Sequence, residues 1–250
     1  RRPASALEEV ERLEVGGDAL STDGAEPSHM HTEAEAETGS GNFHRGYEWW
    51  VAKQARRRNP RVKLYALPWE WPAWVGEGTG DPYHNMSKPL RYVISWLRGA
   101  KEVHGLAFDY MGVWNENRCE PDYVVALRNA LDEEGFELTK IIAPDAARKA
   151  AGTLISIMLE RPDVRAAVHA VGYHYPNSNP NVSVADQILL GRSLWASEDD
   201  STVDPPFPPS GSAPVTPHPR RQPGGACLVR TINQNWVQGN MTATIVWNLV

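Results

Sequence analysis

The sequence predicts an α/β protein of the (β/α)8 TIM-barrel type, and three observations indicate this fold. Short runs rich in β-branched and aromatic residues alternate with segments of helical spacing, which is typical of parallel strands joined by right-handed crossovers. The glycine fingerprint GxGxxG of dinucleotide-binding open sheets is absent after the first strand. Polar side chains cluster where the predicted strands end, as they do at the mouth of a barrel.

The strand predictions rest on composition and length. Seven segments qualify: "RLEVGG" (12–17), "VKLYALPW" (62–69), "LAFDYMGVW" (106–114), "TKIIAPD" (139–145), "VHAVGYHYP" (168–176), "SLWASED" (193–199) and "TATIVWNLV" (242–250). Because seven strands cannot close the usual barrel, we expect this chain to lack the first strand, with an eighth strand upstream of Arg1. The third segment is then strand four and the sixth is strand seven.

Helical spacing of apolar residues fills the gaps between the strands. The predicted helices are "YEWWVAKQARRRN" (47–59), "LRYVISWLRGAKEVHG" (90–105), "DYVVALRNALDEEG" (122–135), "AARKAAGTLISIMLE" (146–160) and "VRTINQNWVQGN" (229–240). Two segments interrupt the alternation and are interpreted as loop insertions. Residues 32–41 are acidic and then rich in glycine and serine, and residues 204–224 carry eight prolines. A lid, a partner-binding arm and a sequence foreign to the fold are all open interpretations of the second segment.

Composition limits the possible functions. A length of 250 residues suits a single partial barrel domain over 1–250, and a net charge of −6 gives no basis for binding nucleic acid. No run of eighteen apolar residues predicts a membrane span. Two cysteines are too few for a disulfide scaffold and have no metal-type spacing. Three N-x-S/T triplets, at Asn85, Asn181 and Asn240, favour a secretory route if they are used.

Carboxylates end two of the predicted strands. Glu116 and Glu198 lie 82 residues apart at the ends of strands four and seven, and so on opposite walls of the predicted mouth. Two carboxyl groups about 5 Å apart are what a retaining glycosidase needs as acid and nucleophile, and Asn115 is suited to bind a sugar 2-hydroxyl. The pKa of Glu116 is expected to be raised by its neighbour and by a dry site. The alternative for any one such glutamate is a solvated turn residue.

Several long motifs carry a family resemblance. They are "VGGDALSTDGAEPSHMH", "YEWWVAKQARRRNP", "LPWEWPAWVG", "DYMGVWNEN", "KIIAPD", "LWASEDDST" and "NQNWVQGNMTATIVWNLV". Together, from about Leu13 to Val250, they resemble glycoside hydrolase family fifty-nine. The resemblance implies a barrel enzyme that removes galactose from galactosylceramide, without metal or cofactor, in the lysosome. It also implies a saposin-type activator protein that presents the lipid.

The resemblance assigns roles to matching positions. In the family, the Glu of the WNE motif is the acid and base and the Glu of the SSED motif is the nucleophile, which correspond to Glu116 and Glu198. Substrate-binding residues correspond to Thr22, Trp69, Asn115 and Trp247. The family's β-sandwich and lectin-like domains, and an arginine contributed from beyond the barrel, have no counterpart in this chain. A catalytically silent carbohydrate-binding remnant of the enzyme is therefore the alternative function.

Overall fold

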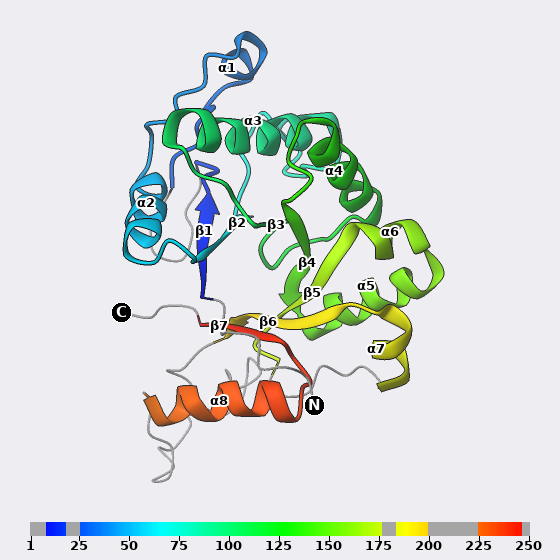
Figure 1. The fold of residues 1–250 in the computed structure, drawn as a ribbon. Helices are drawn as coiled ribbons and strands as arrows, with labels where there is room; N and C mark the ends of the chain where they lie inside the picture. Colours follow the sequence, from blue (N-terminus) through cyan, green and yellow to red (C-terminus); the bar gives the residue numbers. More distant parts are fainter. Residues whose placement is uncertain (1–8, 19–25, 177–183, 200–224, 247–250) are drawn as a thin grey trace, which may run out of the picture.

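One parallel sheet forms the centre of the molecule. The structure is a computed structural model, which describes residues 9–18, 26–176, 184–199 and 225–246. Within these residues seven strands pair in chain order, each parallel to the next (Figure 1). They are β1 (Val10–Val15), β2 (Lys63–Pro68), β3 (Tyr110–Gly112), β4 (Lys140–Ala147), β5 (Val168–His174), β6 (Ser193–Asp199) and β7 (Ala243–Val246).

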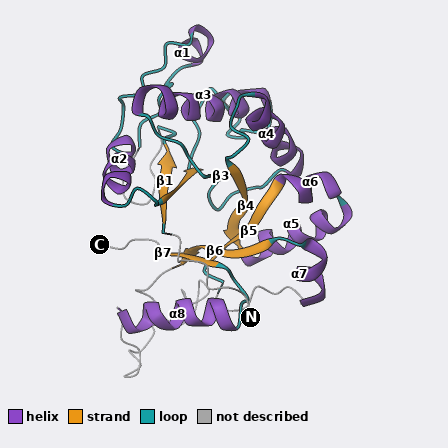
Figure 2. Ribbon diagram, viewed as in Figure 1, coloured by secondary structure: helices purple, strands orange, loops and turns teal. Residues whose placement is uncertain are grey.

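The sheet curls into a nearly closed barrel. Arg12 in β1 forms hydrogen bonds across the interior to Ser197 and Glu198 in β6, which a flat sheet would not allow. Helices surround the strands on the outside (Figure 2). The predicted TIM-barrel class is therefore confirmed. A compact set of inward side chains fills the barrel: Tyr65, Leu67, Tyr110, Ile142, Ala170, Trp195 and Ile245.

A larger apolar layer lies between the strands and the helices. The helices are α1 (Glu33–Thr38), α2 (Glu48–Arg58), α3 (Ser87–His104), α4 (Pro121–Glu133), α5 (Arg148–Glu160), α6 (Pro162–Ala167), α7 (Val184–Leu190) and α8 (Gly225–Val237). Side chains such as Leu13, Leu64, Trp96 and Leu127 join this layer from both sides. None of the helices in the described ranges has the length and hydrophobicity needed to cross a membrane.

Local sequence determines where the helices begin and end. Helix α3 stops at Gly105, whose φ of 65° lies in the left-handed region that glycine adopts without steric penalty. Helix α4 begins with Pro121 in its first turn, where the missing N–H costs nothing. Helix α1 corrects the prediction of a loop at 32–41, because Thr32 and Glu35 form a reciprocal capping box that nucleates one short helix. Residues 204–224, the other predicted insertion, lie outside the described residues.

Two bulges shape the carboxyl ends of the strands. The β4–β5 pairing shifts register between Pro144 and Ala146, so that Asp145 is the extra residue. The β5–β6 pairing shifts between Tyr173 and His174, and Ser197 is the extra residue of the opposing strand. A bulge turns the side chain of the extra residue away from the regular alternation. Both side chains are fully buried and meet behind the mouth of the barrel.

Candidate active site

The two predicted catalytic glutamates come together at the mouth of the barrel. Glu116 follows β3 and Glu198 is the penultimate residue of β6, and each contributes a carboxylate oxygen to a group of atoms that lie within 4.8 Å of one another. The glutamates differ in environment, because the side chain of Glu116 is 49% exposed and that of Glu198 is 6% exposed. One carboxylate therefore faces solvent and the other is held within the protein.

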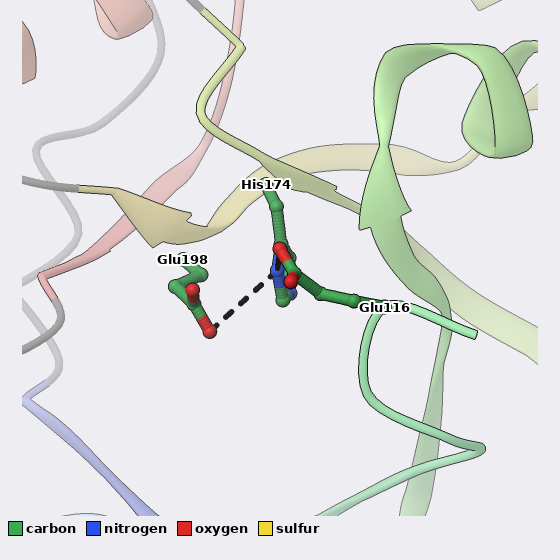
Figure 3. Close-up of side chains that lie close together, drawn as sticks. All are labelled: Glu116, His174 and Glu198. Carbon is green, nitrogen blue, oxygen red and sulfur yellow. Dashed lines mark hydrogen bonds and ion pairs between the residues drawn. The ribbon is translucent and has the colours of Figure 1, made fainter. Parts of the chain in front are cut away.

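His174, the last residue of β5, lies between these glutamates (Figure 3). Its Nδ1 atom is 2.9 Å from Oε1 of Glu116 and 3.5 Å from Oε2 of Glu198. The ring is completely buried, so its orientation is set by protein contacts and not by water. A single imidazole thus connects the exposed carboxylate to the buried one.

Asp145 fixes the far side of this ring. Its Oδ1 atom lies 2.8 Å from Nε2 of His174 and accepts a hydrogen bond of 2.6 Å from the Ser197 hydroxyl. The backbone is also linked here, since the Glu116 amide donates to the Asp145 carbonyl at 3.0 Å. The bulges at Asp145 and Ser197 therefore hold the imidazole in one orientation beneath the two glutamates.

Arg12 and Tyr175 hold the carboxylate of Glu198 from two further sides. Arg12 Nη2 lies 2.6 Å from Glu198 Oε2, and the Tyr175 hydroxyl donates to Glu198 Oε1. The Tyr175 amide also donates to the Glu198 carbonyl at 2.8 Å. Both oxygens of this buried carboxylate therefore accept directed hydrogen bonds, which is the usual condition for a buried charge.

The acidic surroundings of His174 control its protonation. Burial acts to lower the pKa of His174, but hydrogen bonds to Asp145 and Glu116 and the charges of Asp145 and Glu198 outweigh it and raise the pKa to about 9. The hydrogen bond from His174, opposed by burial, lowers the pKa of Glu116. The expected rise in the pKa of Glu116 is thus wrong, because a cation and not a second carboxylate is its nearest partner.

Glu116, His174 and Glu198 also present one ligand atom each to a common point, as a metal site would. A histidine binds a metal ion through a neutral imidazole nitrogen that has a free lone pair. Both nitrogens of His174 instead face carboxylate oxygens within 2.9 Å, and its pKa lies well above neutrality. The charge balance of the cluster therefore favours a proton over a metal ion on this ring.

The other predicted site residues divide into two groups. Asn115 is buried beside Glu116 and its Oδ1 atom has no hydrogen-bond partner among the described residues, while Trp69 follows β2 and lies 4.8 Å from the Arg12 guanidinium. Both lie at the mouth with the glutamates. Thr22 and Trp247 lie outside the described residues.

Sequence reasoning missed Arg12 as a member of the site. In "VERLEV" the charged Arg12 and Glu14 alternate with the apolar Leu13 and Val15. This period of two indicates that the polar side chains of β1 share one face of the strand. The register confirms it, since Arg12 is paired with the inward-facing Tyr65. Ser197 could have been found in the same way, because it lies two residues after the inward-facing Trp195.

Comparison with known proteins shows the family of this chain. The model of the family described as Glycosyl hydrolase family 59 matches residues 4–250. The chain belongs to this family. A galactocerebrosidase from Danio rerio is 44% identical over 239 residues, and one from Homo sapiens is 39% identical over the same length. Each match covers 96% of this chain but 32% and 31% of the relative, so the family 59 chain spans about a third of the length of these curated relatives.

Solved structures of distant sequence share the family 59 fold. SrfJ from Salmonella typhimurium superimposes with a TM-score of 0.73 at 18% identity, over 96% of this chain and 56% of SrfJ. An endo-β1,6-glucanase gives a TM-score of 0.65 at 17% identity, over 96% of this chain and 57% of the glucanase. These likenesses support the barrel architecture alone.

Proposed function

We propose that this protein is a retaining glycoside hydrolase that removes β-linked galactose from galactosylceramide and related galactolipids. The observation that carries the proposal is the separation of the two carboxylates. Oxygens of Glu116 and Glu198 lie within 4.8 Å of each other, close to the spacing of about 5 Å in retaining enzymes and shorter than the roughly 6.5–9.5 Å of inverting ones. This separation suits direct attack by one carboxylate and leaves no room for the sugar and an attacking water together.

The first step uses Glu198 as the nucleophile. Its carboxylate attacks the anomeric carbon, the glycosidic bond breaks, and a galactosyl ester forms on Glu198. The leaving oxygen takes a proton through Glu116. In the substrate-free protein that proton is on His174, 2.9 Å from Glu116 Oε1, so the pair stores one proton that the exposed carboxyl delivers.

The second step hydrolyses the ester. Once Glu198 is esterified its negative charge is gone, and the ionised form of Glu116 is favoured because the neighbouring like charge has been removed. Glu116 then takes a proton from a water molecule, which attacks the anomeric carbon and releases galactose with retained configuration. The exposure of Glu116 suits this exchange with solvent.

We propose that Asn115 and Trp69, together with Thr22 and Trp247, bind galactose. Asn115 supports this because its buried Oδ1 atom is available for a ligand hydroxyl, and Trp69 because its ring can pack on a sugar face. The galactolipid substrate follows from the relatives, which are galactocerebrosidases.

The cellular setting belongs to the same proposal. We place the protein in the lysosome, reached by the secretory route, with a saposin-type activator that lifts the lipid from its bilayer. The support is membership of family 59 and the similarity to galactocerebrosidases. The activator is tested by turnover of galactosylceramide in vesicles, which should rise when a saposin-type protein is added.

A covalent trap tests the mechanism. The protein is incubated with a 2-deoxy-2-fluoro-β-galactosyl fluoride, which slows the second step, and is then digested and analysed by mass spectrometry. We expect one added 2-deoxy-2-fluorogalactosyl group on the peptide that contains Glu198, with fluoride as the leaving group. Glu198→Gln should prevent labelling, whereas Glu133→Gln, a substitution of an exposed glutamate in α4, should leave it unchanged.

The outcomes separate the candidate functions. Labelling elsewhere than Glu198, or undiminished labelling in Glu198→Gln, would contradict the assigned nucleophile. No labelling of a folded protein that still binds galactose would favour a silent binding remnant over an enzyme. Proton NMR identifies the anomer of galactose that is released first. If its configuration is opposite to that of the substrate, the mechanism is inverting and not retaining.

A further inference from the structure

Arg12 is a fully enclosed cation next to the proposed nucleophile. Only 5% of its side chain is exposed, although arginine is rarely buried without a partner. It comes from the middle of β1, opposite β6 across the barrel, and its guanidinium makes two different contacts there. Nη2 lies 2.6 Å from Glu198 Oε2, and Nη1 donates to the Ser197 carbonyl at 3.2 Å.

These contacts restrain the position of the Glu198 side chain. The planar guanidinium holds the carboxylate and the preceding carbonyl with two N–H groups in fixed relative directions, which a lysine ammonium cannot reproduce. The bulge at Ser197 makes that carbonyl available beside the nucleophile. Tyr175 donates to the other oxygen of the carboxylate, so rotation of the Glu198 side chain is blocked at both oxygens.

The same guanidinium lies 4.8 Å from the centre of the Trp69 ring. A cation over an aromatic face is attracted by the ring quadrupole, and the attraction is strongest when water is excluded. One face of Trp69 is thereby covered by Arg12, and the partly exposed ring also packs against the side chains that fill the barrel. Arg12 thus joins the proposed nucleophile to the proposed sugar platform.

We propose that Arg12 is a positioning residue that keeps the Glu198 carboxylate aimed at the anomeric carbon, and that buttresses Trp69 in the same contact. The proposal rests on the proposed function for its catalytic consequence. The predicted position of Glu198 can be tested without activity, because removal of the guanidinium should displace the Glu198 carboxylate.

The test compares Arg12→Met with Arg12→Lys. The methionine variant removes the cation and keeps much of the side-chain volume. The lysine variant keeps the cation and removes the planar guanidinium with its two directed N–H groups. Arg56→Met is the matched control, since Arg56 forms a partly buried ion pair with Asp109 at 2.9 Å. Asp109 immediately precedes β3, so this pair lies at the opposite end of the barrel from the mouth. Crystal structures show the position of Glu198, and the rate constant of labelling by the fluoro-galactoside shows its reactivity.

We expect Glu198 to leave its position near Glu116 in Arg12→Met and the labelling rate constant to fall about 100-fold, as for a misplacement of about 1 Å. Arg12→Lys should recover part of the lost labelling rate, because it keeps a cation beside Glu198, and should still label more slowly than the wild type. Arg56→Met should match the wild type in the position of Glu198 and in the labelling rate.

An unmoved Glu198 in a folded Arg12→Met protein overturns the proposal, whether or not the protein is active. If that variant does not fold, Arg12→Lys decides: wild-type placement of Glu198 and a wild-type labelling rate overturn the proposal, and a displaced Glu198 supports it. If the wild type itself is not labelled, the proposed hydrolase function fails, while the crystal structures still decide the positioning role.

Discussion

Acidification should destabilise the protein through His29. This residue lies in the segment after β1 with 2% of its surface exposed, packed between the rings of Phe43 and Tyr92 at centroid distances of 5.4 and 4.4 Å. Burial, and then the charge of Arg45, lower the pKa of His29 from 6.5 to about 3. The folded protein therefore keeps this ring neutral at pH values where the unfolded chain protonates it.

The sign and size follow from proton linkage. A depressed pKa in the folded state means that the contribution of His29 to stability is complete above pH 6.5 and is lost as the pH falls towards 3. At about pH 4.5 the two-unit distance from 6.5 corresponds to about 2.7 kcal/mol of unfolding free energy. His29→Leu removes the titrating group and keeps an apolar side chain in the same space.

Urea unfolding at about pH 7 and about pH 4.5, followed by tryptophan fluorescence, measures this difference. Between the two pH values the variant should lose about 2.7 kcal/mol less unfolding free energy than the wild type. Phe43→Leu is the control, since it disturbs the same packing without a titrating group and should show the pH dependence of the wild type. Equal pH dependence of the wild type and His29→Leu would refute the reasoning.

Three other substitutions give distinct outcomes. Burial, and then the charges of Glu26 and Glu14, raise the pKa of Glu48 to about 8. The contribution of Glu48 to stability is therefore complete below pH 4.5 and is lost as the pH rises through 8. Glu48→Gln should raise the unfolding free energy near pH 7 by about 3 kcal/mol, measured by urea unfolding. Asp145→Asn should lower the pKa of His174, move the basic limb of the kcat/KM profile to lower pH and reduce activity about 10- to 100-fold. Asn115→Ala should reduce kcat/KM about 10- to 100-fold with an unchanged Tm, because its Oδ1 atom has no partner to lose among the described residues.

Strand positions were predictable because each strand is a short β-branched or aromatic run bounded by polar residues. The predicted strand at 193–199 coincides with β6, and the one at 62–69 exceeds β2 by one residue at each end. The prediction at 106–114 is much longer than β3, which is only Tyr110–Gly112. Four of the extra residues, Leu106, Phe108, Val113 and Trp114, are buried by packing and not by pairing, and apolar composition does not distinguish the two.

The candidate site was predictable only where a side chain ends a regular strand. Glu116 and Glu198 follow from that rule, and they do lie together. Helices α6 and α7 were missed because they have only six and seven residues, which is too short for a clear helical period. The pKa of Glu116 was predicted in the wrong direction because the partner that decides it, His174, is 58 residues away in sequence.

Backbone conformation at the mouth has a consequence for engineering this protein. Asp18, Glu116, Asp145 and Tyr175 all have positive φ, between 46° and 62°, and each lies at the carboxyl end of a strand. A side chain in this left-handed region costs about 1–2 kcal/mol relative to the ordinary helical region, and glycine avoids that penalty. At the half-exposed Glu116, selection for thermal stability alone should therefore favour glycine, whereas glycine at the buried Asp145 would lose the hydrogen bonds to His174 and Ser197. Directed evolution that ignores turnover would then remove the proposed acid and base, at a position where the native sequence tolerates backbone strain.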